Sequence, residues 1–482
     1  RGKIFDRNGE ILVSNTDRLA IVYYPPANMT SSKEWELAYK MADTFEFDYS
    51  NLTSRDLKDL YLRLYPAEGK ALIKDEEWNA YSDHELSDND IYLLKLSRIT
   101  DSALSKLDDR TREAYIVEYA MSVAPYQSLK VIKDNATIDE VAYLIEHNSL
   151  FPGFDVNIYF DRSYPQDSLL RGLLGSVTSS TQGLSSENLL TYLALGYARN
   201  SSVGRSGLEY QYESLLKGSD STYQVNFNDE GLAYFTEKLE GSKGQDLVLS
   251  IDSDLQKKVE EVITKALVDN IDNPYRAYLE SIYLVALQPS TGDVLSMAGM
   301  KITEEGIVYN DPVSTYTDSY AAGSSIKGAV VYMGLTEDLI QPGEIILDTP
   351  VKIADTPLKR SWKDLGFVYD QTALSMSSNV FMFHIAMRLG GADYSYNAPL
   401  SIDIEAFNTF RSYFSQFGLG VYTGLDVNNE SLGYRGFSSL GGHLLDFAIG
   451  QYDTYTTIQL AQYISTIAND GVRVQPRLLI ES

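Results

Sequence analysis

The segment Tyr320–Tyr332 dictates a sharp turn from a loop into a buried helix. Its sequence Gly-Ser-Ser-Ile-Lys leads into an apolar run with small residues, a pattern that predicts the start of a buried helix. Side chains three residues apart share one helix face, so we expect the Ser324 hydroxyl and the Lys327 amine to face the same space. That pairing is typical of a nucleophile beside its general base.

The first turn of this helix offers the parts of an acyl-transfer site. A serine hydroxyl needs a base to take its proton, and a lysine serves only as the free amine. Burial and the positive end of the helix dipole both disfavour the ammonium, so we expect a lowered pKa for Lys327. The motif alone does not decide, because Ser214–Lys217 matches it within an ordinary helical pattern. Taken alone, Ser324 is better explained as a helix N-cap.

A second polar motif, Ser377-Ser378-Asn379, stands between two apolar stretches. This arrangement predicts a tight turn between helices that faces a cleft. There the Ser377 hydroxyl could relay a proton to a leaving amine, and the Asn379 carboxamide could hold a peptide bond. Alone, the triplet is better explained as a turn with satisfied side chains. A Ser-Asp-Asn sequence at residues 87–89 lies in an acidic stretch, and we treat it as coincidence.

Composition restricts the partners and the kinds of site. Forty Lys and Arg against 67 Asp and Glu leave a formal net charge of −27, which argues against nucleic acid or anionic lipid as a direct partner. The chain has no cysteine, so disulfides and thiolate metal sites are excluded. Its four histidines form no ligand pair, so we expect neither a metal nor a cofactor.

The patterning predicts an α+β protein in two parts. A hairpin turn is expected at Asp6–Gly9, and residues 31–146 are acidic and helical. The linker Gly241–Gln245, rich in Gly, Ser and Lys, is the best candidate for a domain boundary. Beyond it, a strand, a helix and an apolar strand hairpin precede the Ser324 helix. Within the acidic stretch, helices are expected at Glu34–Phe45, Ser54–Leu64 and Asp90–Leu107.

In their order along the chain, these motifs resemble those of the class B penicillin-binding proteins, and most of all the elongation-type enzymes of streptococci and their relatives. Ser324 with Lys327 resembles the S-x-x-K motif of that family, and Ser377 with Asn379 resembles its S-x-N motif. The likeness is weakest in the acidic stretch. Further segments that carry it are Arg1–Asn15, Gly204–Gly218, Ser250–Gln256, Pro289–Met297, Phe417–Asp426, Gly450–Tyr463 and Ile467–Pro476.

The resemblance implies a division into two domains. Residues 1–243 would form an elongated, non-catalytic pedestal of the dimerisation type, with the acidic helical stretch at about 31–146 inserted in it. Residues 244–482 would form a transpeptidase domain, with an antiparallel sheet covered by helices on both sides and an all-helical part. No Lys-Thr-Gly, the third family motif, occurs in the 482 residues, so we expect its strand to lie outside this chain.

The resemblance also implies an activity, a peptidoglycan D,D-transpeptidase that cross-links stem peptides through an acyl-serine and is acylated by β-lactams. Matched by position, Ser324 is the acylated serine, Lys327 its base, Ser377 the proton relay and Asn379 the group that orients the donor amide. Trp362 stands where the family often has an aromatic wall of the cleft. Together with Ser378, it is expected to contact the substrate.

Partners and location follow from the same resemblance. It implies a single N-terminal membrane helix that is absent from this chain, residues 1–482 on the extracellular face of the cell membrane, and a membrane glycan polymerase with the elongation machinery as partners. Two alternatives remain. A wall-synthesis scaffold or a β-lactam sensor would keep the fold without turnover. A serine β-lactamase would share Ser324 and Lys327 but would need a glutamate-held water and no long N-terminal part.

Overall fold

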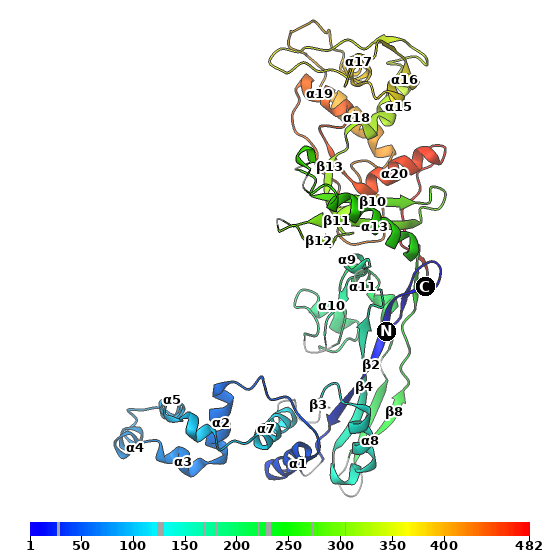
Figure 1. Cartoon of the computed structure of the whole chain (residues 1–482). Coiled ribbons are helices and arrows are strands. Elements are labelled where there is room, and N and C mark those ends of the chain that lie inside the picture. Colours follow the sequence, from blue (N-terminus) through cyan, green and yellow to red (C-terminus); the bar gives the residue numbers. More distant parts are fainter. Residues whose placement is uncertain are drawn as a thin grey trace. The chain divides into compact units, whose positions relative to one another are not determined.

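The computed structural model describes residues 1–482 except 27–28, 123–129, 167–168, 180–181, 200, 220, 228–232, 272, 277 and 304. Contacts divide the chain into two compact units. Unit 1 comprises residues 1–14, 162–219 and 243–482, and unit 2 comprises residues 15–161 and 220–242. Helices and strands occur in both units (Figure 1), which confirms the predicted α+β class.

Unit 2 contains a small sheet, two helices packed on it, and a lobe of short helices. Its elements are β2 (Ile11–Tyr23, from residue 15 on), α1 (Ser31–Thr44), α2 (Ser54–Leu64), α3 (Pro66–Ala71), α4 (Asp75–Ser82), α5 (Asp88–Arg98), α6 (Asp101–Leu104), α7 (Asp109–Ser122), β3 (Lys130–Lys133), α8 (Ile138–Glu146), a 3-10 turn (Asn148–Leu150), β4 (Phe154–Ser163), β7 (Thr222–Phe227) and β8 (Ala233–Leu239). Strands β3 and β4 both pair with β2. Met41 of α1 and Val117 of α7 are buried in one cluster with Ile21 of β2.

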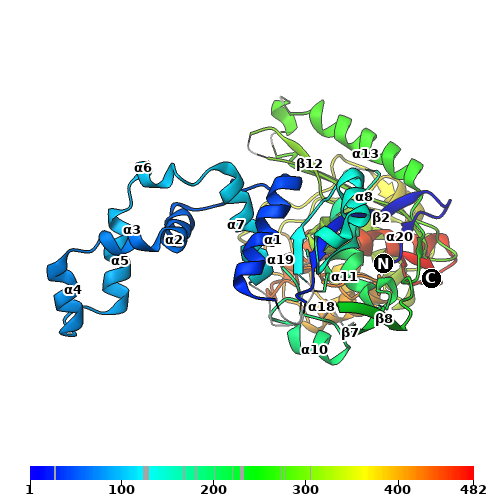
Figure 2. The same ribbon diagram turned by 90° about the horizontal axis from the view of Figure 1, so that it is seen from below.

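Helices α2 to α6 form a lobe beside α1 and α7 (Figure 2) with its own small core. The helices predicted at Glu34–Phe45 and Ser54–Leu64 are confirmed as α1 and α2. The third predicted segment, Asp90–Leu107, is two helices, because the Thr100 hydroxyl accepts a hydrogen bond from the Ala103 N–H and begins α6. The Ser-Asp-Asn sequence at 87–89 is the capped start of α5.

Unit 1 carries the Ser324–Lys327 and Ser377–Asn379 motifs. Its elements before residue 300 are β1 (Ile4–Phe5), α9 (Arg171–Leu174), β5 (Ser176–Val177), α10 (Leu189–Ala194), β6 (Gly204–Ser206), α11 (Gly207–Gln211), α12 (Glu213–Leu216), β9 (Leu247–Leu249), α13 (Ser253–Val268), η2 (Pro274–Arg276), β10 (Ser281–Leu287) and β11 (Val294–Ile302). Those after it are β12 (Val308–Asn310), α14 (Ser314–Thr317), β13 (Ser319–Ala321), η3 (Gly323–Ile326), α15 (Lys327–Thr336), β14 (Ile346–Leu347), β15 (Phe367–Val368), α16 (Asp370–Ser375), α17 (Asn379–Leu389), α18 (Glu405–Gln416), α19 (Gly441–Ala448), β16 (Thr454–Thr456), α20 (Thr457–Ala468) and β17 (Leu479–Glu481). The predicted turn at Asp6–Gly9 joins β1 to β2, which pair antiparallel.

Strands β10, β11 and β12 form an antiparallel sheet in that order. Ile282 of β10 packs in one cluster with Ile263 of α13, whereas Val285 packs in another with Ile458 of α20. Residues 282 and 285 of a strand point to opposite faces, so the two helices cover the two sides of the sheet. This arrangement agrees with the predicted sheet with helices on both sides.

A largely helical part, which also contains the small β14–β15 sheet, surrounds the Ser377–Asn379 motif. Helices α15, α17, α18 and α19 share one large apolar core, in which Val330, Phe381, Phe410 and Phe447 are buried. Because Lys327 begins α15 and Asn379 begins α17, this packing determines how far apart the two predicted motifs lie.

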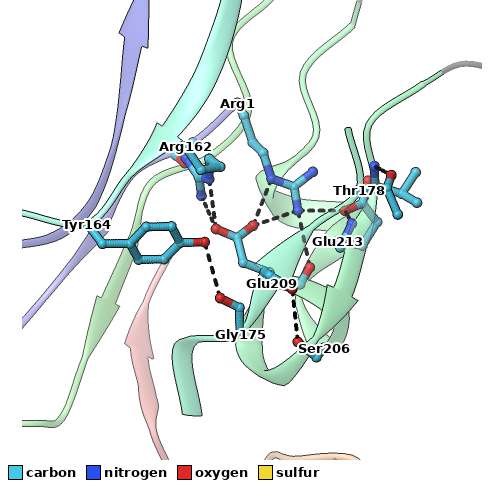
Figure 3. A network of polar contacts seen from close by, with 12 residues as sticks. Arg1, Arg162, Tyr164, Gly175, Thr178, Ser206, Glu209 and Glu213 are labelled. Carbon is cyan, nitrogen blue, oxygen red and sulfur yellow. Dashed lines mark hydrogen bonds and ion pairs between the residues drawn. The ribbon is translucent and has the colours of Figure 1, made fainter. Parts of the chain in front are cut away.

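A buried network of four charged side chains joins the first residue of the chain to the segments after residue 161 (Figure 3). Arg1 lies 2.8 Å from Glu209 and 2.6 Å from Glu213, and Arg162 lies 2.6 Å from Glu209. The Glu213 carboxylate also accepts a hydrogen bond of 2.7 Å from the Gly204 N–H. Two guanidinium groups and two carboxylates balance each other, so no buried charge is left uncompensated.

Candidate active site

Ser324 lies on a 3-10 turn, η3, that leads directly into α15. Gly323 has φ +58°, a left-handed conformation that costs glycine little, and its N–H donates to the Gly450 carbonyl at 2.9 Å. Gly450 is left-handed as well, and a Cβ there would lie 2.1 Å from the Gly323 carbonyl oxygen. The close approach of these two glycines therefore fixes the turn that presents Ser324, which is exposed.

Lys327, the first residue of α15, is buried and points at the second motif. Its Nζ lies 3.0 Å from the Ser377 carbonyl oxygen, 3.1 Å from Ser377 Oγ and 2.6 Å from Asn379 Oδ1. Burial lowers the pKa of Lys327 to about 8, although the Asp348 carboxylate acts in the opposite direction. The predicted convergence of the two motifs is thus present in the structure.

The three contacts of Lys327 suit both of its protonation states. A carbonyl oxygen and an amide oxygen only accept, whereas a hydroxyl can donate or accept. A neutral amine can donate its two hydrogens to the Ser377 carbonyl and Asn379 Oδ1 and still offer its lone pair to a hydroxyl. An ammonium can donate to all three groups. The site can therefore hold the lysine before and after it takes up a proton.

The turn between α16 and α17 presents Ser377 in an unusual backbone conformation, with φ +55°. A non-glycine residue pays about 1–3 kcal/mol for such a conformation, which persists only where the surroundings enforce it. Here the N–H groups of Ser377 and Ser378 donate back to Leu374 and Ala373 at 3.1 and 2.8 Å. As a result both the carbonyl and the hydroxyl of Ser377 face Lys327.

Asn379 opens α17 and has its amide group held at both ends. Nδ2 donates to the Arg360 carbonyl at 3.0 Å, while Oδ1 accepts from Lys327. This pairing fixes which end of the amide faces the lysine.

Ser378 and Trp362, both predicted to contact substrate, lie in different surroundings. Ser378 is fully buried, and its hydroxyl donates to Asp348 at 2.5 Å and accepts from the Phe381 N–H at 3.0 Å. The prediction for Ser378 is therefore corrected, because its hydroxyl holds the turn and does not face the solvent. Trp362 is 70% exposed, and its Nε1 donates to the Met376 carbonyl at 3.1 Å, which places the ring beside the turn.

Sequence reasoning missed two buried residues behind this turn, Asp348 and Ser361. The Ser361 hydroxyl donates to Asp348 at 2.8 Å and accepts from the Asn379 N–H at 2.9 Å. Neither residue belongs to a recognisable motif, and both lie on the connection between α15 and α16, outside its two short strands β14 and β15. An acidic residue inside an apolar context, Ile345-Ile346-Leu347-Asp348, is the only signal that the sequence offers.

Metal-binding groups and membrane-spanning helices are both absent from the part of the chain that the structure describes. No group of three or more His, Asp or Glu side chains among them could hold a metal ion. No helix among them is long and apolar enough to cross a membrane.

Comparisons with known proteins match the chain along its length. The penicillin-binding protein dimerisation domain matches residues 1–249, and the penicillin-binding protein transpeptidase domain matches residues 282–482. Penicillin-binding protein 2A of Bacillus subtilis is 44% identical over 487 residues, which cover 100% of this chain and 68% of that protein. Peptidoglycan D,D-transpeptidase MrdA of Salmonella typhimurium is 24% identical over 442 residues, 86% of this chain and 67% of that protein. The structure of penicillin-binding protein 2B from Streptococcus pneumoniae (strain R6) matches with a TM-score of 0.75 at 29% identity and covers 99% of this chain and 77% of that chain.

Proposed function

The chain belongs to the class B penicillin-binding proteins and is a peptidoglycan D,D-transpeptidase, and we propose that Ser324 is its nucleophile and Lys327 the base that activates it. Ser377 relays protons and Asn379 orients the donor peptide. The observation that carries this assignment is the buried Lys327 amine, which meets Ser377 and Asn379 within hydrogen-bond distance one turn of helix after Ser324.

The first half of the reaction is acylation. Lys327 takes the proton of the Ser324 hydroxyl, and Oγ bonds to the carbonyl carbon of the penultimate D-alanine of a stem peptide. The peptide bond to the last D-alanine then breaks, and its nitrogen leaves with a proton that the lysine returns through the Ser377 hydroxyl. The products are a serine ester and free D-alanine.

The second half transfers the acyl group. An amine of a neighbouring stem peptide attacks the ester carbonyl and gives a proton to the Ser377 and Lys327 pair. The ester bond breaks, Ser324 recovers its proton, and a new peptide bond remains as the cross-link. A β-lactam, like the stem peptide, contains an amide bond whose nitrogen can leave, although that bond lies in a ring. The acylation step therefore explains why a β-lactam acylates the same serine.

The remaining roles belong to the edges of the cleft and to the rest of the chain. Trp362 forms an exposed wall beside the Ser377 turn, where an extended peptide could pack against its ring. Residues 1–243 form a non-catalytic pedestal and residues 244–482 the transpeptidase domain. The two matched domain ranges support this division, whereas contacts group residues 1–14 and 162–219 of the pedestal with residues 243–482. The chain works on the extracellular face of the cell membrane, in contact with a membrane glycan polymerase and the elongation machinery.

Labelling with a fluorescent penicillin tests the nucleophile. The intact protein should gain one penicillin, mass spectrometry should locate the adduct on Ser324, and the adduct should persist. Ser324→Ala should abolish labelling, while Ser325→Ala, which changes the neighbouring hydroxyl, should retain it. Labelling of Ser324→Ala at the rate of the unaltered protein would overturn the assignment.

Turnover of a thioester analogue of the stem peptide tests the second half of the reaction. A transpeptidase should release the thiol continuously and transfer the acyl group to an added amine. A β-lactam sensor would label without releasing thiol, and a β-lactamase would lose its penicillin adduct rapidly. Either of these results would contradict the proposed reaction.

A further inference from the structure

We propose that Asp348 is a positioning residue of this site, which holds the turn at residues 377–379 against Lys327 through two serine hydroxyls. The inference rests on the roles proposed above for Ser324 and Lys327. It adds a residue that contacts neither the substrate nor the reacting atoms but determines where Ser377 and Asn379 lie.

Asp348 is a buried carboxylate with two hydroxyl donors. It directly follows β14 and is only 6% exposed. Ser361 Oγ and Ser378 Oγ both donate to the same oxygen, Oδ2, at 2.8 and 2.5 Å. Hydrogen bonds to a carboxylate are among the stronger ones in proteins, so these contacts hold three separate parts of the chain together.

The carboxylate also determines which way the two hydroxyls point. A hydroxyl has one hydrogen, so a serine that donates to a carboxylate has only lone pairs left for its other neighbours. Ser361 accepts from the N–H groups of Asn379 and Val380 at 2.9 and 3.4 Å, and Ser378 accepts from the N–H of Phe381 at 3.0 Å. These N–H groups belong to the first turn of α17, and the N–H groups of a first turn have no acceptors within their own helix. The start of α17 is therefore capped by two serines that the carboxylate orients.

The same connection reaches the catalytic groups directly. Arg360 accepts from the Asn379 side chain through its carbonyl, and Trp362 donates to the carbonyl of Met376. Ser361 lies between these two residues, so its anchor on the carboxylate holds both contacts in register. The two contacts hold Met376 and Asn379, and Ser377, which lies between these two residues in the chain, has the left-handed conformation.

Besides holding the turn in place, Asp348 acts on Lys327 through its charge. The carboxylate raises the pKa of Lys327, against the larger effect of burial. On α17, which packs on α15, burial lowers the pKa of His384, so the imidazole stays neutral above pH 7. Further charged or titratable groups around this arrangement are Glu344 and Arg388, which form an ion pair, and Tyr463, whose hydroxyl accepts from the Ala329 N–H. Removal of the Asp348 charge should therefore lower the pKa of Lys327.

Three variants of the intact protein test the inference: Asp348→Asn, Ser361→Ala and, as a control, Asp355→Asn. Asp355 is an exposed acidic residue on the same connection, and its left-handed backbone suits asparagine. The rate of penicillin acylation is measured from about pH 6 to about pH 10, where the profile reports the pKa of the base. Thermal melting gives the folded fraction of each variant, and rates are divided by it.

Asp348→Asn should lower the plateau rate between about tenfold and a hundredfold, because the acceptors around Lys327 lose their fixed positions. Its pH midpoint should shift to lower pH, which a loss of general stability would not cause. Ser361→Ala should lower the plateau at least about threefold with the midpoint unchanged, since it removes an acceptor but no charge. Asp355→Asn should resemble the unaltered protein.

The inference fails if Asp348→Asn matches the control in both plateau and midpoint. If Asp348→Asn does not fold, Ser361→Ala decides, and a plateau equal to that of the control would overturn the inference. Failure of the proposed function is distinguishable, because it would appear as labelling of Ser324→Ala whatever the behaviour of the Asp348 variant.

Discussion

The rate of Ser324 acylation should follow the titration of Lys327. Only the free amine can accept the serine proton, and the pKa of Lys327 is lowered by burial to about 8. The free amine then makes up about 9% of the protein at pH 7, about half at pH 8 and about 91% at pH 9. The second-order rate constant for a penicillin should therefore rise about tenfold from pH 7 to pH 9 and level off above.

A lysine with its ordinary pKa of 10.5 would behave differently. Its free amine would amount to about 0.03% at pH 7 and about 3% at pH 9, so the rate constant would rise about a hundredfold and continue to rise. The two cases differ about tenfold over a range in which His384, whose pKa is lowered, does not change charge.

The assay is the early time course of labelling with a fluorescent penicillin at constant ionic strength. Hydrolysis of the drug by hydroxide is measured without protein and subtracted. Lys327→Arg keeps a positive charge across this range and should label slowly at every pH. A rate constant that is flat from pH 7 to pH 9, or that rises a hundredfold without levelling, would show that a buried Lys327 is not the group that takes the proton.

Substitutions at Gly450, Glu209 and Ser377 test other parts of the structure. Gly450→Ala should slow acylation at least about tenfold and lower the free energy of unfolding by about 1–3 kcal/mol, because its Cβ would meet the Gly323 carbonyl; labelling and thermal melting measure both effects. Glu209→Gln should lower the free energy of unfolding, measured by urea denaturation, by about 3–5 kcal/mol, since two buried guanidinium groups lose their shared carboxylate. The control Glu261→Gln, in an exposed ion pair, should change that free energy by less than about 0.5 kcal/mol. Ser377→Gly should be about 1 kcal/mol more stable than Ser377→Ala, because only glycine adopts φ +55° easily, yet both should acylate slowly; equal stabilities would contradict strain at this turn.

Local sequence patterns predicted the parts of the site that are local. The spacing of Ser324 and Lys327 on one helix turn, the turn at Ser377, and helices such as α2 all depend on neighbours within four residues, where periodicity and glycine placement are informative. The family resemblance to streptococcal enzymes agrees with the match to penicillin-binding protein 2B.

Contacts between distant segments were not predictable in this way. Asp348 meets Ser361 and Ser378 only because three irregular segments pack together, and no periodic pattern encodes that packing. The predicted contact of Ser378 with the substrate, which its burial contradicts, has the same origin, since a turn sequence does not say which of two adjacent serines is buried. The break between α5 and α6 was missed because apolar spacing continued across the cap at Thr100.

The division of unit 1 into three separate stretches of chain affects how the protein emerges from the ribosome. Strand β1 pairs with β9, and Arg1 pairs with Glu209, so the first residues must wait for partners more than two hundred positions later. The helices between residues 31 and 122 depend on nearby partners and can form while translation continues. We therefore expect the helices between residues 31 and 122 to form before Arg1 and β1 meet their partners, a step whose speed the long separation limits.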